Sequence, residues 1–81
     1  MLKNRRQYSA FLKVITSFRL TKKISQKQLA EKLGVSQPFV SKYESGERRL
    51  DLLELRQICS ALNISLIKFI RELEKEIDSQ Q

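Results

Sequence analysis

Apolar residues recur along this chain at spacings of three and four, with polar residues between them, in five successive segments. Residues three and four apart lie on one face of an α-helix, so each segment predicts an amphipathic helix. No strand is expected. The fold class predicted is therefore all-α, a compact five-helix domain. Its helices should span about residues 6–21, 26–33, 37–45, 52–62 and 66–77.

The apolar positions of these segments define the candidate core. The 81 residues are expected to form a single domain, residues 1–81, whose core extends from residue 8 to residue 73. The residues expected to face inward are Tyr8, Phe11, Leu12, Ile15 and Phe18 in the first helix, Leu52, Leu55, Ile58, Cys59 and Leu62 in the fourth, and Leu66, Phe69 and Leu73 in the fifth.

The second and third helices carry the strongest local signals. Ser25 precedes the second helix as an N-cap, whose hydroxyl accepts from the free amides of the first turn. Gly34 follows that helix, where its end requires a positive φ. Val35 is expected to tuck under the turn, Ser36 to cap the third helix, and Pro38 to occupy its first turn, where a missing N–H costs no bond. Two caps and a three-residue link predict a helix-turn-helix.

Comparable signals delimit the other helices. Gly46 is expected to end the third helix, and Asp51 to cap the fourth. Asn63 tolerates the left-handed conformation at the end of the fourth helix, and Ser65 is a candidate cap for the fifth.

One set of residues stands in register across most of the chain: Ser25-Gln26, Leu29-Ala30, Gly34-Val35-Ser36, Val40-Ser41, Glu44, Ser45-Gly46, Ala61-Leu62 and Ile64-Ser65. On these residues the chain resembles the lambda-repressor/Cro-type helix-turn-helix family, also called the xenobiotic-response-element family of bacterial and phage regulators. The resemblance covers Phe11 to Phe69. It implies binding of operator DNA, usually by a dimer.

The charge of the chain is concentrated in its first part. Residues 1–50 contain twelve Lys and Arg against three Glu, a net charge of +9, whereas residues 51–81 contain four against six acidic residues, a net charge of −2. A basic excess indicates either a solvated surface or a polyanionic partner. Its coincidence with the helix-turn-helix favours double-stranded DNA as the partner.

The third helix is expected to read base edges with its outward face, because Val40 and Tyr43 should face the core. The amide of Gln37 has the geometry for a bidentate bond to adenine, and Lys42 can donate to guanine or to a phosphate. Pro38 cannot donate, so it should contact a thymine methyl group or nothing. The residues expected to read bases are Gln37, Pro38, Ser41 and Lys42.

A second set of residues is expected along the DNA backbone. Gln26 presents its amide beside free backbone N–H groups, which suits a phosphate oxygen, and the resemblance implies that it also contacts Gln37. Gln28 is interpreted as solvated. Phe39 is either a core wedge or, as we prefer, part of the groove wall, and the lysines can equally be solvated charges. The backbone set is Gln26, Ser36, Phe39, Ser45, Arg48, Arg49, Lys22 and Lys23.

Two further contacts are expected. The resemblance implies a structural ion pair between Arg19 and Glu44 beneath the DNA-binding surface, the alternative being two ordinary surface charges. The fifth helix has more apolar residues than one core-facing stripe can hide, which predicts a homodimer interface at Ile67, Ile70 and Ile77. The alternative is that the first helix covers these residues.

The cysteine and histidine content and the absence of other motifs exclude several classes of function. Cys59 is the only cysteine, so a disulfide within the chain is excluded, and we expect a buried thiol and a cytoplasmic protein. No segment is long and apolar enough to suggest a membrane span, and no secretory signal is expected. With no histidine, paired carboxylates, phosphate loop or metal spacing, we expect no enzyme, cofactor or metal. No small-molecule effector is expected either.

The preferred function is therefore sequence-specific binding of double-stranded DNA as a transcriptional regulator. We expect a repressor or controller that acts as a homodimer on a pseudo-palindromic operator. The alternative is an antitoxin that binds a toxin and regulates its own promoter.

Overall fold

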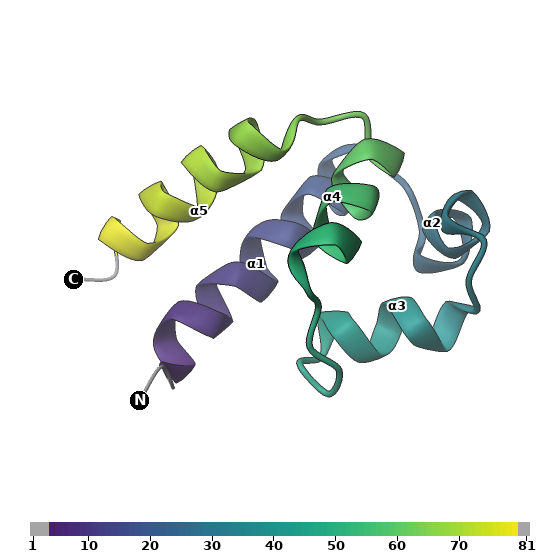
Figure 1. Cartoon of the computed structure of the whole chain (residues 1–81), viewed down its shortest axis with the longest axis horizontal. Helices are drawn as coiled ribbons and strands as arrows, with labels where there is room; N and C mark the ends of the chain where they lie inside the picture. The colour runs from purple at the N-terminus through teal and green to yellow at the C-terminus, as the bar shows by residue number, and fades with distance from the viewer. Residues whose placement is uncertain (1–3, 80–81) are drawn as a thin grey trace.

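The computed structural model describes residues 4–79. Within that range it contains five α-helices and no strand: α1 (Arg5–Thr21), α2 (Gln26–Leu33), α3 (Gln37–Glu44), α4 (Leu52–Ala61) and α5 (Leu66–Ser79) (Figure 1). The predicted all-α class is confirmed. Each predicted helix end lies within two residues of the observed one, because local caps fix these ends.

Reciprocal hydrogen bonds fix the starts of α2 and α4. The Ser25 hydroxyl accepts from the backbone N–H of Gln28 at 3.0 Å, and the Gln28 side chain accepts from the N–H of Ser25 at 2.8 Å. Asp51 and Glu54 form the same capping box at α4. Gln28 is thus a capping residue and not merely a solvated one, and the Ser-x-x-Gln spacing indicates this from sequence. Ser65 caps α5 by accepting from Lys68 N–H at 3.0 Å.

The end of α2 and the start of α3 differ in how they are capped. Gly34 has the left-handed conformation expected, with φ of 71°. Ser36 occupies the N-cap position of α3, but its side chain makes no capping bond, contrary to expectation. The reason is local: Pro38 has no N–H to offer, and the N–H of Phe39 already donates to the carbonyl oxygen of Ser36 at 3.1 Å.

The core lies where α1 packs against α5 and α3, and where α2 packs against α3 and α4 (Figure 1). Cys59 lies within it, as expected, and burial raises the pKa of its thiol to about 11. The fully buried large side chains are Tyr43, Phe69, Ile15, Leu29, Ile58, Leu62, Val40 and Cys59.

Two residues expected inside are exposed. Leu52 shares a helical face with Leu55, but it is the first residue of α4, and 63% of it remains exposed. Val35 is also exposed instead of being tucked under the turn. A position on the right face buries a side chain only where a neighbouring element covers that turn.

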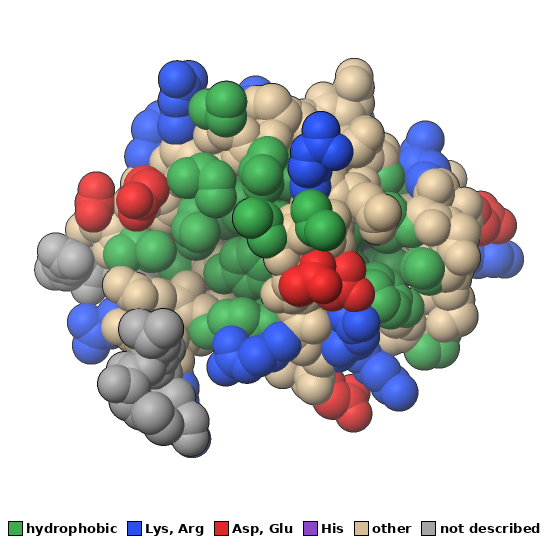
Figure 2. All heavy atoms as spheres, viewed as in Figure 1, with side chains coloured by type: hydrophobic (Ala, Val, Ile, Leu, Met, Phe, Trp, Pro, Cys, Tyr) green, Lys and Arg blue, Asp and Glu red, His purple; other side chains and the backbone are tan. Residues whose placement is uncertain are grey.

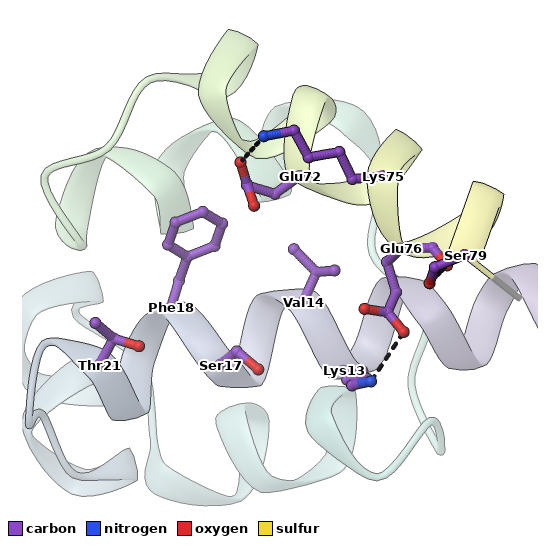
Figure 3. A pocket seen from close by; sticks show the side chains of 9 residues that line it. All are labelled: Lys13, Val14, Ser17, Phe18, Thr21, Glu72, Lys75, Glu76 and Ser79. Carbon is purple, nitrogen blue, oxygen red and sulfur yellow. Dashed lines mark hydrogen bonds and ion pairs between the residues drawn. The ribbon is translucent and has the colours of Figure 1, made fainter.

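The last helix runs along α1 and is joined to it by an ion pair between Lys13 Nζ and Glu76 Oε2 at 2.9 Å. Beside this pair lies an open groove of about 480 Å³, in which the Phe18 ring stands between the two helices (Figure 3). Within residues 4–79, no helix combines the length and apolar character that crossing a bilayer requires.

Candidate nucleic-acid interface

Helix α3 has an inner face that is fixed and an outer face that is exposed. Val40 and Tyr43 are fully buried in the core. On the opposite side Gln37, Pro38 and Lys42 are exposed, and the helix begins immediately after the α2–α3 turn. Three of the four residues predicted to read bases are therefore presented together to solvent.

The serines of α3 are less free than their position in the sequence suggests. The hydroxyl of Ser41, which is half-buried, donates to the carbonyl oxygen of Pro38 at 3.2 Å. The hydroxyl of Ser45 donates to the carbonyl oxygen of Lys42 at 3.0 Å. A hydroxyl has a single hydrogen to donate, so either serine must rotate before it can donate to DNA.

Arg19 and Glu44 form an ion pair beneath α3. The Nε and Nη2 of Arg19 donate to the two carboxylate oxygens of Glu44 at 2.7 and 3.0 Å, and Nη1 donates to the carbonyl oxygen of Ile24 at 2.8 Å. The two side chains are only 10% and 7% exposed. Hydrogen bonding to Glu44 raises the pKa of Arg19, against the opposing effect of burial. The pair ties the end of α1 to the end of α3.

Gln26 joins this pair from the first turn of α2. Its Nε2 donates to Oε1 of Glu44 at 2.9 Å, the same oxygen that accepts from Arg19. The partner expected for Gln26 was Gln37, but in the structure its amide is directed to Glu44. Nε2 retains a second hydrogen, and the amide oxygen is an acceptor, so a phosphate contact by Gln26 is compatible with this arrangement.

Both arginines of the loop between α3 and α4 lie over aromatic rings. The guanidinium carbon of Arg48 lies 4.5 Å from the centroid of the Phe39 ring, and that of Arg49 lies 4.1 Å from the centroid of Tyr8. Phe39 itself is half-buried and packs edge-on against Tyr43, with centroids 5.9 Å apart. This packing favours the core-wedge alternative for Phe39 over the groove wall that we preferred.

The other residues predicted along the DNA backbone lie at exposed positions. Ser36 and Ser45 are exposed at the two ends of α3. Lys22 and Lys23 are exposed in the connection between α1 and α2, where Lys23 has a positive φ of 58°. This connection leads directly into the first turn of α2.

Helix α5 lies on the opposite side of α1 and α4 from α3 (Figure 1) and presents apolar side chains to solvent. Ile67 is 66% exposed and Ile70 is 40% exposed, whereas Ile77 is half-buried. Figure 2 shows apolar side chains gathered on the face that carries α4 and α5. The alternative that α1 covers these isoleucines therefore does not hold for Ile67 and Ile70.

Sequence reasoning missed two features of the site, the bond between Gln26 and Glu44 and an ion pair between Arg48 and Glu54. The Asp-x-x-Glu spacing identifies Glu54 as a capping residue, but no local pattern indicates that Arg48 folds back onto it. Both features depend on how the helices pack.

Comparison with known proteins extends these observations. The family model described as helix-turn-helix matches residues 15–69. An uncharacterised HTH-type transcriptional regulator of Mycobacterium tuberculosis is 45% identical over 51 residues, which are 63% of this chain and 36% of that protein. The chain therefore spans about a third of the length of this relative.

Solved structures resemble the whole fold. The restriction–modification controller protein C.Esp1396I has a TM-score of 0.83 and 31% identity, with 91% of this chain and 95% of that one covered. Another structure holds that controller as a tetramer in complex with its natural 35 base-pair operator. An XRE-family like protein from Pseudomonas syringae has a TM-score of 0.80 and 38% identity, with 85% of this chain and 84% of that one covered.

Proposed function

The chain belongs to the helix-turn-helix family, and from this membership we propose that it regulates transcription by sequence-specific binding of double-stranded DNA. The observation that carries the proposal is the outer face of α3, where Gln37, Pro38 and Lys42 are exposed together while Val40 and Tyr43 anchor the helix from below. The Mycobacterium tuberculosis relative is called a transcriptional regulator, and one of the similar structures contains operator DNA.

Helix α3 enters the major groove and reads bases with its first two turns. Gln37 forms two hydrogen bonds with an adenine, and Lys42 donates to a guanine or to a nearby phosphate. Pro38 contributes at most an apolar contact, and Ser41 contributes its small size, because its hydroxyl is already used by the backbone.

Phosphate contacts on either side of α3 position the domain without reading sequence. Gln26 contributes from the first turn of α2, and Lys22 and Lys23 from the preceding connection. Ser36 contributes from the start of α3, and Ser45 contributes from its end once its hydroxyl rotates away from the carbonyl oxygen of Lys42. The excess of basic residues in this part of the chain supplies the attraction to any duplex.

The protein acts as a homodimer, in which α5 of one copy faces α5 of the other. The exposed isoleucines Ile67 and Ile70, with Ile77 at their border, supply an apolar surface for this contact. A single domain contacts about half a turn of DNA, so pairing through α5 doubles the site that is read. The antitoxin alternative is not favoured, since the Mycobacterium tuberculosis relative is named a transcriptional regulator and a similar structure is named a restriction–modification controller.

The decisive experiment selects binding sites from random duplex DNA and then measures affinities for the selected site and its single-base variants. Gln37→Ala should reduce discrimination at one base pair of each half-site by about 1–3 kcal/mol, because the bidentate bond to adenine is lost. The other base pairs of the same site serve as the internal control. Failure to select any site, or a loss spread equally over all base pairs, contradicts the proposed reading by α3.

A further inference from the structure

We propose that Glu54 on α4 is an affinity-limiting residue of the DNA interface, because it holds the guanidinium of Arg48 and so limits sequence-independent binding. The inference rests on the proposed function. Arg48 lies in the loop that follows α3, and the sequence alone predicts that its charge contacts the DNA backbone. The structure gives it an acidic partner within the protein.

The contacts of Arg48 show how fully its guanidinium is engaged. Nη2 donates to Glu54 Oε2 at 2.8 Å, and Nη1 donates to Glu54 Oε1 at 3.2 Å and to the carbonyl oxygen of Arg49 at 3.0 Å. Three of its five N–H groups are therefore used. One face of the guanidinium lies over the ring of Phe39, which belongs to α3.

Glu54 cannot follow Arg48 towards a phosphate, because α4 holds it in place. Its Oε1 also accepts from the backbone N–H of Asp51 at 3.0 Å, and its own N–H donates to Asp51 Oδ1 at 2.7 Å. The bond from Arg48 and the N–H of Asp51 lower the pKa of Glu54, so its carboxylate stays ionised at neutral pH. The acidic partner of Arg48 is thus a fixed part of the start of α4.

This arrangement sets what Arg48 contributes when DNA binds. The pair remains partly exposed, at 39% for Arg48 and 28% for Glu54, so a phosphate can reach the two N–H groups that are still free. A phosphate that approaches Arg48 also approaches the Glu54 carboxylate, and repulsion from the carboxylate offsets attraction to the guanidinium. Arg48 then adds little to the affinity for an arbitrary duplex, and discrimination is left to the base contacts of α3.

The test removes the charge of Glu54 and keeps its capping role. Gln at this position still accepts from the backbone N–H of Asp51, so Glu54→Gln preserves the capping box. We expect Glu54→Gln to bind a random-sequence duplex about two- to fivefold more tightly per subunit than the wild type, with a salt dependence steeper by about 0.9 per subunit. Affinity for the selected site should rise by a similar factor, because a phosphate contact does not depend on the base sequence. Fluorescence anisotropy over a range of salt concentrations measures all three quantities.

Glu47→Gln is the matched control, because Glu47 is an exposed acid of the same loop that lies outside the Arg48–Glu54 pair. It removes the same charge without releasing Arg48. In an Arg48→Ala background, Glu54→Gln should give no larger gain than Glu47→Gln does. Far-UV circular dichroism of each variant checks that the helices persist.

The possible outcomes separate the inference from the function on which it rests. Equal gains from Glu54→Gln and Glu47→Gln, or weaker binding by Glu54→Gln, overturn the role of Glu54 and leave DNA binding intact. A gain that survives in the Arg48→Ala background overturns it as well. A wild-type protein that binds neither selected nor random duplex overturns the proposed function and this inference together.

Discussion

Helices α3 and α5 both carry apolar residues on more than one turn, but the two helices bury these residues to different extents. In α3 the inward residues Val40 and Tyr43 are fully buried, and the outward face consists of polar residues and a proline. In α5 only Phe69 is fully buried, whereas Ile67 and Ile70 remain in solvent. The outer face of α3 therefore suits a polar, charged partner, and that of α5 suits an apolar one.

The two helices are also held differently. The end of α3 is fixed from below by a buried ion pair and by the amide of Gln26, which donates to Glu44, whereas α5 lies along α1 with the exposed Lys13–Glu76 ion pair at the border of an open groove. A surface that reads bases requires side chains held in a fixed geometry, while an apolar interface becomes rigid when its partner arrives. Because the two surfaces are held differently, substitutions should disrupt each of them separately.

The largest effect is expected at α5. Ile70→Glu should dissociate the proposed dimer, because burial of one isoleucine contributes about 1.5–3 kcal/mol and a two-fold interface loses it twice. Sedimentation equilibrium measures the assembly state. Lys68→Glu places the same charge on a different side of α5 and should leave the dimer intact. If Ile70→Glu assembles like the wild type, this face of α5 is not the interface.

The next effect concerns the support of α3. Arg19→Met and Glu44→Gln should each reduce the free energy of unfolding by about 3–5 kcal/mol, because each leaves the other member of a buried ion pair without its charge partner. Urea and thermal melts measure the loss. Lys75→Met removes the ion pair of Lys75 with Glu72 on the surface of α5 and should not change the melts measurably. Melts of Arg19→Met that match the wild type would contradict a structural role of the buried pair.

The smallest expected effect is a gain in the free energy of unfolding, opposite in sign to the losses expected from Arg19→Met and Glu44→Gln. The hydroxyl of Tyr43 is buried and has no hydrogen-bond partner within the described part of the chain. Tyr43→Phe removes this unsatisfied group and keeps the ring packed against Phe39, so the free energy of unfolding should rise by about 1 kcal/mol. In a domain of this size, that gain raises the melting temperature by about 4–8 °C. Destabilisation by Tyr43→Phe would mean that the hydroxyl is satisfied in solution.

The helices themselves were predictable from sequence because their limits are local. Capping residues such as Ser25 and Asp51, and the left-handed positions Gly34 and Asn63, act within one helical turn, so a reader of the sequence sees all the groups involved. The exposed face of α3 follows from the same periodicity. The error at Leu52 shows where this reasoning stops, because periodicity identifies a face but not how far its neighbours extend.

The sequence by itself therefore determined the five helices, the helix-turn-helix and the concentration of positive charge beside it. The tertiary structure alone decided which side chains meet beyond one helical turn: Gln26 of α2 with Glu44 of α3, the loop residue Arg48 with Glu54 of α4, and Phe39 of α3 beneath Arg48. The physical reason is that a cap requires only the chain next to it. A hydrogen bond between residues on different helices requires their packing to bring donor and acceptor within about 3 Å.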